Sequence, residues 1–218
     1  MKRVIIVCEG QTEQSFCKEL LQPYFNNSFI YLENPTIKKT MGGIVNWQAL
    51  KHQIELHLLQ DTSAIVTTFI DYYGIYKHHR YPFWDEAEKI NDKNERISKI
   101  EQAMKSDVEK SISNRFIPYI QLHEFECFIF SDETIFEKRF DAKELLNLQY
   151  LKKTCVEYAT PELINQGNET APSKRLTKHI SGYQKTIDGI EMTKQIGLNR
   201  IIETCPRFKN WISTIKNI

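Results

Sequence analysis

Five acidic residues stand just after predicted β-strands, near the points where those strands end. They are Glu9, Glu13, Asp71, Glu124 and Glu126. Apolar runs at 4–8 and 64–70 and a strand candidate at 116–122 precede them, and Glu13 lies one helical turn after Glu9. Open α/β sheets form their sites beyond the carboxyl ends of the strands. We therefore expect these carboxylates to gather at one edge of a sheet.

A cluster of carboxylates favours the binding of a cation. Like charges raise one another's pKa unless a cation neutralises them, and hard oxygen ligands select Mg²⁺ or Mn²⁺ rather than zinc. Taken singly, an acid that follows a strand is often a helix N-terminal residue favoured by the helix dipole, and Glu13 suits that description. Since three strand ends each deliver an acid, the sequence predicts a Mg²⁺ or Mn²⁺ site with these five acids as its ligands.

Basic residues indicate where a polyanion would bind. Lys174 and Arg175 open a predicted helix, and we expect their side chains to be exposed. A cation beside a metal stabilises the charge that develops on a phosphate. A second set of basic residues is predicted to contact nucleic acid. It comprises Lys77, Arg80, Lys178 and Lys185. The alternative for both sets is a solvated surface charge, although aromatic residues interleaved through 72–84 make base stacking available beside this loop.

Other catalytic chemistries find less support in the sequence. His123 precedes Glu124, where it would be a metal ligand, a proton carrier or a structural histidine. The five cysteines lack C-x-x-C spacing, and there is neither a Gly-x-Ser-x-Gly elbow nor a Gly-x-x-x-x-Gly-Lys-Ser/Thr loop. A zinc ribbon, a serine hydrolase of the α/β type and a P-loop ATPase are therefore excluded.

Composition restricts the class of protein further. The 218 residues are 41% hydrophobic, and 29 Lys and Arg against 28 Asp and Glu leave a net charge of +1, so any nucleic-acid binding must be local. No apolar run reaches the ~20 residues that span a bilayer, and the run after Arg3 is too short for the core of a signal peptide. Unpaired cysteines suit reduced thiols, so we expect a cytoplasmic protein without a membrane partner.

The elements that must position these residues alternate between strand and helix. Strands are expected at 4–8, 29–32, 64–70 and 116–122. Helices are expected from Thr12 to near Pro23, over 47–58, within 85–113, and near 141–157, 173–196 and 198–216, with a loop at 38–43. Pro118 places the last strand at an edge or in a bulge, and Lys174, Lys178 and Lys185 share a helix face if the helix continues past Gly182.

This order of elements predicts the fold class and the organisation of the chain. It indicates an α/β fold with a mainly parallel sheet flanked by helices. Residues 1–132 would form this core, and residues 133–218 would form a helical C-terminal extension packed on it.

Four motifs in this order resemble those of a bacterial Toprim-like family, distantly similar to the OLD-family nucleases and often encoded beside an AAA or ABC-type ATPase. They are Glu-Gly-Gln-Thr-Glu (9–13), Asp-Tyr-Tyr-Gly (71–74), His-Glu-Phe-Glu (123–126) and Pro-Ser-Lys-Arg (172–175). The resemblance implies a Toprim fold with Glu9 as metal ligand or acid–base, and with Glu13 and Asp71 as further ligands. The sequence departs from the Toprim pattern at Tyr73, where a second aspartate is expected.

Two functions follow from these observations. The first is a Mg²⁺- or Mn²⁺-dependent nuclease or related phosphodiester enzyme acting on DNA or RNA, in bacterial defence with an ATPase partner, with Glu9, Lys174 and Arg175 as catalytic residues. The second is a degenerate Toprim-like subunit that regulates a partner ATPase, which Tyr73 favours. The oligomeric state is not specified by the sequence.

Overall fold

A parallel five-stranded sheet forms the centre of the molecule. The computed structural model describes residues 2–38, 44–165 and 167–218, so that most of the predicted loop at 38–43 lies outside the described residues. The strands are β1 (Lys2–Cys8), β2 (Ile30–Glu33), β3 (Ile65–Asp71), β4 (Phe116–Ile117) and β5 (Ile120–Gln121). Their order is β2-β1-β3-β4, β5 also pairs with β3, and every pairing is parallel. The predicted α/β class with a mainly parallel sheet is confirmed.

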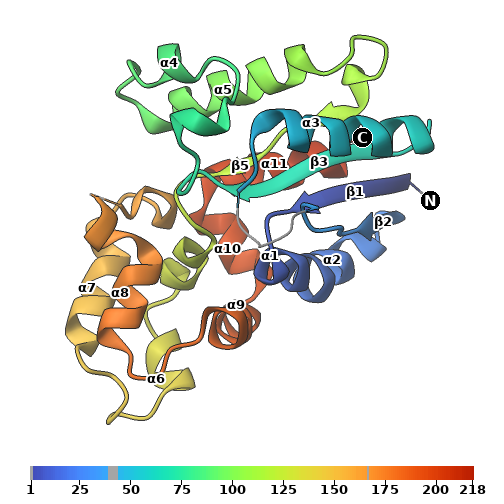
Figure 1. The fold of residues 1–218 in the computed structure, drawn as a ribbon. Helices are drawn as coiled ribbons and strands as arrows, with labels where there is room; N and C mark the ends of the chain where they lie inside the picture. The colour runs from blue at the N-terminus through green and yellow to red at the C-terminus, as the bar shows by residue number, and fades with distance from the viewer. Residues whose placement is uncertain (1, 39–43, 166) are drawn as a thin grey trace.

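Helices cover both faces of this sheet. They are α1 (Gln11–Phe16), α2 (Gln22–Asn26), α3 (Trp47–Gln60), α4 (Trp84–Ala87), α5 (Lys93–Asp107), α6 (Ile135–Arg139), α7 (Leu148–Glu157), α8 (Pro172–His179), α9 (Ile190–Ile196), α10 (Leu198–Thr204) and α11 (Pro206–Lys216). Figure 1 shows α3, α4 and α5 on one side of the sheet and α1, α2, α10 and α11 on the other. No helix among the described residues is long and apolar enough to span a membrane.

The apolar runs of the strands pack on both helical layers. In β1, Ile5 and Val7 join the core with α3 and α5, while Val4, Ile6 and Cys8 join the core with α1, α2 and α11. A strand buried on both faces needs no alternation of apolar and polar residues, which explains the continuous run. Residues of α6 to α8 pack in a third cluster beside the sheet.

The first helical segment continues past its predicted end. The helix begins at Gln11, with Gly10 as its N-cap, one residue before the predicted start at Thr12. A π-helical turn, Cys17–Leu21, then leads into α2, where Pro23 lies in the first turn. Proline is tolerated there because its missing N–H is not required in a first helical turn.

The predicted strand at 116–122 is divided into β4 and β5. Between them, Thr68 of β3 replaces the backbone ladder, since its hydroxyl accepts a hydrogen bond from the Tyr119 N–H at 2.9 Å and donates one to the Tyr119 carbonyl at 2.8 Å. Pro118, which cannot donate to a ladder, explains why the strand is interrupted here.

The helical prediction over 173–196 also needs correction. Helix α8 ends at His179, Gly182 has φ +75°, and Lys185 begins a separate π-helical turn, Lys185–Gly189. Lys174, Lys178 and Lys185 therefore do not share one helix, because the chain turns at a glycine in the left-handed region.

Candidate functional site

Glu9 and Asp71 lie at the same edge of the sheet, as predicted. Strands β1 and β3 are adjacent and parallel, with Cys8 paired to Phe69. Glu9 Oε2 accepts a hydrogen bond from the Asp71 N–H at 2.9 Å. The two acids that follow the two longest strands therefore meet where the chain leaves the sheet.

Glu13 adds a third carboxylate from α1. Its side chain is buried, and Oε2 accepts a hydrogen bond from the Gly10 N–H at 2.9 Å. This contact is the helix N-terminal role that the sequence alternative described. The charge of Glu13 nevertheless reaches the site, since it contributes to raising the pKa of Asp71 and of Lys185.

Glu124 and Glu126 approach from the segment that follows β5. His123 turns the chain with φ +69°, and Phe125–Ser131 forms a 3₁₀ helix beyond it. The Phe125 N–H donates to Asp71 Oδ1 at 3.0 Å, which ties this segment to β3. Glu124 accepts hydrogen bonds from the Ser173 N–H and hydroxyl, both at 2.9 Å, and so fixes the start of α8. Of these two acids, Glu126 is the one that faces Asp71 across a common cation.

That cation is Lys185. Its Nζ lies 3.1 Å from Glu126 Oε2 and 3.8 Å from Asp71 Oδ2, and its side chain is 41% exposed. Burial lowers the pKa of Lys185, but Glu126 and Asp71 outweigh burial, so its pKa is raised. Lys185 was predicted as a nucleic-acid contact, and the structure places it between two of the predicted acids.

Burial perturbs the acids strongly. The pKa of Asp71 is raised by burial and by Glu9 and Glu13, against the lowering effect of Lys185. Burial raises the pKa of Glu126 to about 7, again opposed by Lys185. The two Glu126 oxygens find no hydrogen-bond donor of good geometry among the described residues, although Lys185 forms the ion pair.

The donor atoms suit Mg²⁺ or Mn²⁺ in kind. They are carboxylate oxygens, they outnumber the one ammonium between them, and two of them lack hydrogen bonds. Within the described ranges, however, no group of three or more His, Cys, Asp or Glu side chains is placed to hold a metal ion. Lys185 supplies the compensating charge in this arrangement.

Arg175 does not face the acids as an exposed clamp. It is 4% exposed and donates to the Thr170 carbonyl at 2.7 Å. Its guanidinium also donates to the hydroxyls of Tyr150, Tyr158 and Thr154, at 2.6, 2.9 and 3.2 Å. The predicted exposure is wrong, because α8 turns this position inward against α7.

The remaining predicted cations lie on the surface. Lys174 and Lys178 are exposed on α8, and neither forms an ion pair with a described residue. Lys77 is exposed and pairs with Asp85 at 2.9 Å. Arg80 is exposed with φ +56°. Of the sequence-predicted basic residues, the structure therefore brings Lys185 to the acids.

His123 has the environment of a structural histidine. It is buried, with Nε2 3.4 Å from Lys93 Nζ and Nδ1 3.2 Å from Asn165 Nδ2. Burial, with a contribution from Lys93, lowers its pKa to about 3. Sequence reasoning missed Lys93 and Ser173 as neighbours of the site, and Ser173 stood inside the quoted Pro-Ser-Lys-Arg motif.

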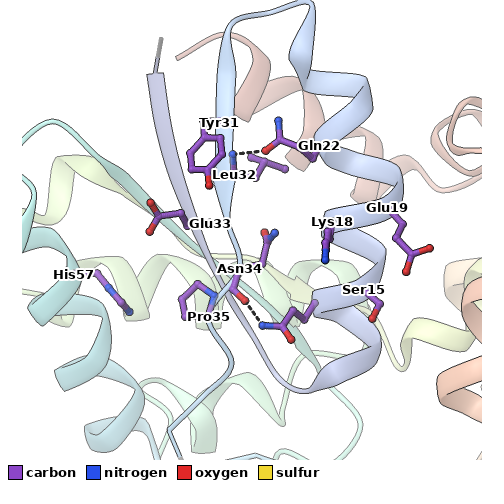
Figure 2. Close-up of a pocket in the computed structure, with 11 residues that line it drawn as sticks. Ser15, Lys18, Glu19, Gln22, Tyr31, Leu32, Glu33, Asn34, Pro35 and His57 are labelled. Atoms are coloured by element: carbon purple, nitrogen blue, oxygen red, sulfur yellow. Dashed lines mark hydrogen bonds between the residues drawn. The ribbon is translucent and has the colours of Figure 1, made fainter.

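A hollow of about 750 Å³ lies beside the edge strand β2, and none of the predicted site residues lines it (Figure 2). Gln22 spans this edge, accepting from the Leu32 N–H at 2.7 Å and donating to the Ile30 carbonyl at 3.1 Å. Gln14 donates to the Asn34 carbonyl at 2.6 Å. The two glutamine side chains thus form hydrogen bonds with backbone groups that would otherwise be open to another strand. They protect this edge of the sheet against pairing with a further strand.

Comparisons with known proteins bear on the family of this chain. No curated protein and no solved structure matches it. A family model described as "Domain of unknown function (DUF4276)" matches residues 8–216, which is nearly the whole chain. The chain therefore belongs to the DUF4276 family.

Proposed function

We propose that this protein is a Mg²⁺- or Mn²⁺-dependent phosphodiester hydrolase acting on nucleic acid, with a Toprim-like site. The observation that carries the proposal is the cluster of Asp71, Lys185 and Glu126 beside Glu9 at the carboxyl edge of β1 and β3. This is where sites form in parallel α/β sheets. A cluster that combines several carboxylates with one ammonium has the groups needed for phosphoryl transfer.

Each residue has a role in this proposal. Glu9, Asp71 and Glu126 would hold the metal after their side chains move closer together, since they are not placed for a metal ion in this arrangement. Glu13 and Glu124 would add negative charge nearby. The bound metal would polarise the phosphate and lower the pKa of a water molecule. Lys185 would then face the phosphate and stabilise its negative charge, which replaces the role first predicted for Lys174 and Arg175.

A second candidate rests on the same lysine. Lys185 already compensates Asp71 and Glu126 without a metal, and Tyr73 stands where the Toprim pattern has an aspartate. These observations favour a degenerate subunit that regulates a partner. For either function we propose a cytoplasmic protein, which the five free cysteines support. As the resemblance implies, it would act beside an AAA or ABC-type ATPase in bacterial defence.

Cleavage assays with labelled single-stranded and duplex DNA and RNA test the first candidate. We expect cleavage with Mn²⁺ or Mg²⁺, none with EDTA, and at least a hundredfold loss in Glu9→Gln and Asp71→Asn, since each would remove a metal ligand. Lys174→Ala, an exposed cation outside the cluster, serves as the matched control and should keep full activity. If calorimetry finds no Mn²⁺ binding and the wild type cleaves nothing, the degenerate subunit becomes the better description.

A further inference from the structure

Three neighbouring rings follow Asp71 on the loop that leaves β3, of which Tyr76 and His78 are exposed and His79 is half-buried. We define Tyr76, His78 and His79 as the aromatic platform. The Tyr76 and His78 rings stack with centroids 5.7 Å apart and an interplanar angle of 15°, and His78 and His79 lie 4.1 Å apart. The Tyr76 N–H donates to His79 Nδ1 at 3.0 Å, and a 3₁₀ turn, Lys77–His79, holds the segment. Tyr76 is 54% exposed, so it offers open ring surface to solvent.

A hollow of about 710 Å³ adjoins this platform. It is lined by Tyr76, Lys77, His78, Trp84 and Glu88. Trp84 is 8% exposed, and its indole N–H finds no acceptor among the described residues. The hollow is therefore walled by aromatic rings, with Lys77 and Glu88 as its charged residues. Flat aromatic ligands suit such walls.

The platform belongs to a segment that lies close to the acidic cluster. The Tyr73 N–H donates to the His123 carbonyl at 2.8 Å, beside Glu124. The pKa of Tyr73 is raised by burial and by the charge of Glu124, and that of Tyr81 by burial and by the charge of Glu9. Tyr76 stands five positions after Asp71, so their Cα atoms are at most about 18 Å apart.

We propose that the aromatic platform stacks an unpaired base of a single-stranded polynucleotide whose backbone passes over the acidic cluster. Every base presents a π-face to such a platform, whereas a duplex covers its base faces by stacking. Arg80 follows the rings, is exposed and provides charge for the phosphates, whereas Lys77 shares its charge with Asp85. Tyr81 and Trp84, which the sequence also offered for stacking, are buried, whereas Phe83 is 41% exposed and adds a further ring beside the platform. This inference deepens the proposed function by naming its substrate class.

Binding without cleavage tests the inference. Anisotropy would compare labelled 12-nucleotide single-stranded RNA, single-stranded DNA, an abasic strand with the same phosphates, and a hairpin duplex. The protein would be the wild type in EDTA and Glu9→Gln, so that no strand is degraded. We expect base-bearing single strands to bind about tenfold more tightly than the abasic strand and the duplex, since one stacked base contributes ~1–3 kcal/mol. Comparing the affinities for the RNA and DNA strands shows which of the two nucleic acids the protein prefers.

Variants locate the effect on the platform. Tyr76→Ala should lose about tenfold in affinity for base-bearing strands and little for the abasic strand, while Tyr76→Phe keeps the affinity because it keeps the ring. Tyr31→Ala, a tyrosine that is 45% exposed on β2, is the matched control and should bind as the wild type does.

The outcomes separate this inference from the proposed function. Equal binding of abasic and base-bearing strands, an unchanged Tyr76→Ala in a folded protein, or no binding of any strand would overturn the platform. If the wild type binds base-bearing strands preferentially but cleaves nothing in Mn²⁺, the platform is supported and only the proposed hydrolase function is contradicted. If the wild type cleaves but Tyr76→Ala does not change its binding, the hydrolase function is supported and the platform is contradicted.

Discussion

Glu126 is the most deeply buried acid of the cluster, at 0% exposed, and Lys185 is its nearest cation. A carboxylate in this position loses hydration, and the ion pair with Lys185 offsets part of that loss. The balance is incomplete, because the pKa of Glu126 is still raised to about 7. The charged form of Glu126, which is present from neutral pH upward, therefore destabilises the fold.

The pH dependence of stability should report this cost. Glu126 keeps its proton up to about pH 7 in the folded protein, whereas the unfolded chain releases it near pH 4.5. Folded protein thus binds more protons between these values, so the free energy of unfolding should fall as pH rises from 4.5 to 7. Glu126→Gln should reduce this slope and gain up to about 3 kcal/mol at pH 8, but little at pH 4.5. Urea unfolding in EDTA at both pH values measures the difference, and parallel curves for the two proteins would contradict it.

At the scale of elements, α8 carries two adjacent cations with opposite environments. Lys174 faces solvent, whereas Arg175 lies between the rings of Tyr150 and Tyr158, with its guanidinium carbon 5.3 and 5.6 Å from their centroids. In the first turn of the same helix, Ser173 holds Glu124. Arg175 therefore anchors α8 to α7, and through Ser173 the helix positions one acid of the site.

Replacing each of these two cations by methionine should distinguish a residue that anchors the helix from one that is only a surface charge. Arg175→Met leaves two tyrosine hydroxyls and a carbonyl without their donor, so we expect a loss of about 3 kcal/mol. Lys174→Met should change stability by no more than about 0.5 kcal/mol. Guanidinium midpoints at a constant m-value measure both effects. Equal stabilities of the two variants would show that Arg175 does not anchor the helix.

At the scale of the whole molecule, the C-terminal helices complete the sheet. Helix α11 places Trp211 against β3, where its indole N–H donates to Thr67 Oγ1 at 2.9 Å. The same ring stacks on Tyr119 at 4.4 Å and lies 5.4 Å from Phe69. One face of the sheet is therefore covered by residues that come more than a hundred positions later in the chain.

Removing these helices should abolish folding of the sheet. A chain of residues 1–132 would expose the face that α11 covers, so we expect no cooperative unfolding transition for it. In the full chain, Trp211→Ala should cost about 3–5 kcal/mol through the cavity that it leaves. Lys209→Ala, on the exposed side of α11, is the control and should be neutral. Cooperative unfolding of the 1–132 chain would instead establish it as an independent domain.

The sequence by itself determined the fold class and the meeting of Glu9 with Asp71. Apolar runs of β-branched residues, each followed at once by an acid, specify buried parallel strands whose carboxyl ends share an edge. These patterns are local, and the geometry of parallel strands is sufficient to place the residues that end them at the same edge of the sheet. For the same reason the helical spacing of 47–58 located α3 correctly.

Only the tertiary structure decided which cation faces the acids. The sequence grouped Lys185 with Lys174 and Lys178 and expected Arg175 at the surface, because a short helix with polar residues on several sides does not indicate which side is buried. The turn at Gly182 sends Lys185 to Asp71 and Glu126. Tyr150 of α7 and Tyr158, which follows that helix, cover Arg175. Both outcomes depend on contacts between residues far apart in the chain, and desolvation and charge pairing act through those distances rather than through sequence spacing.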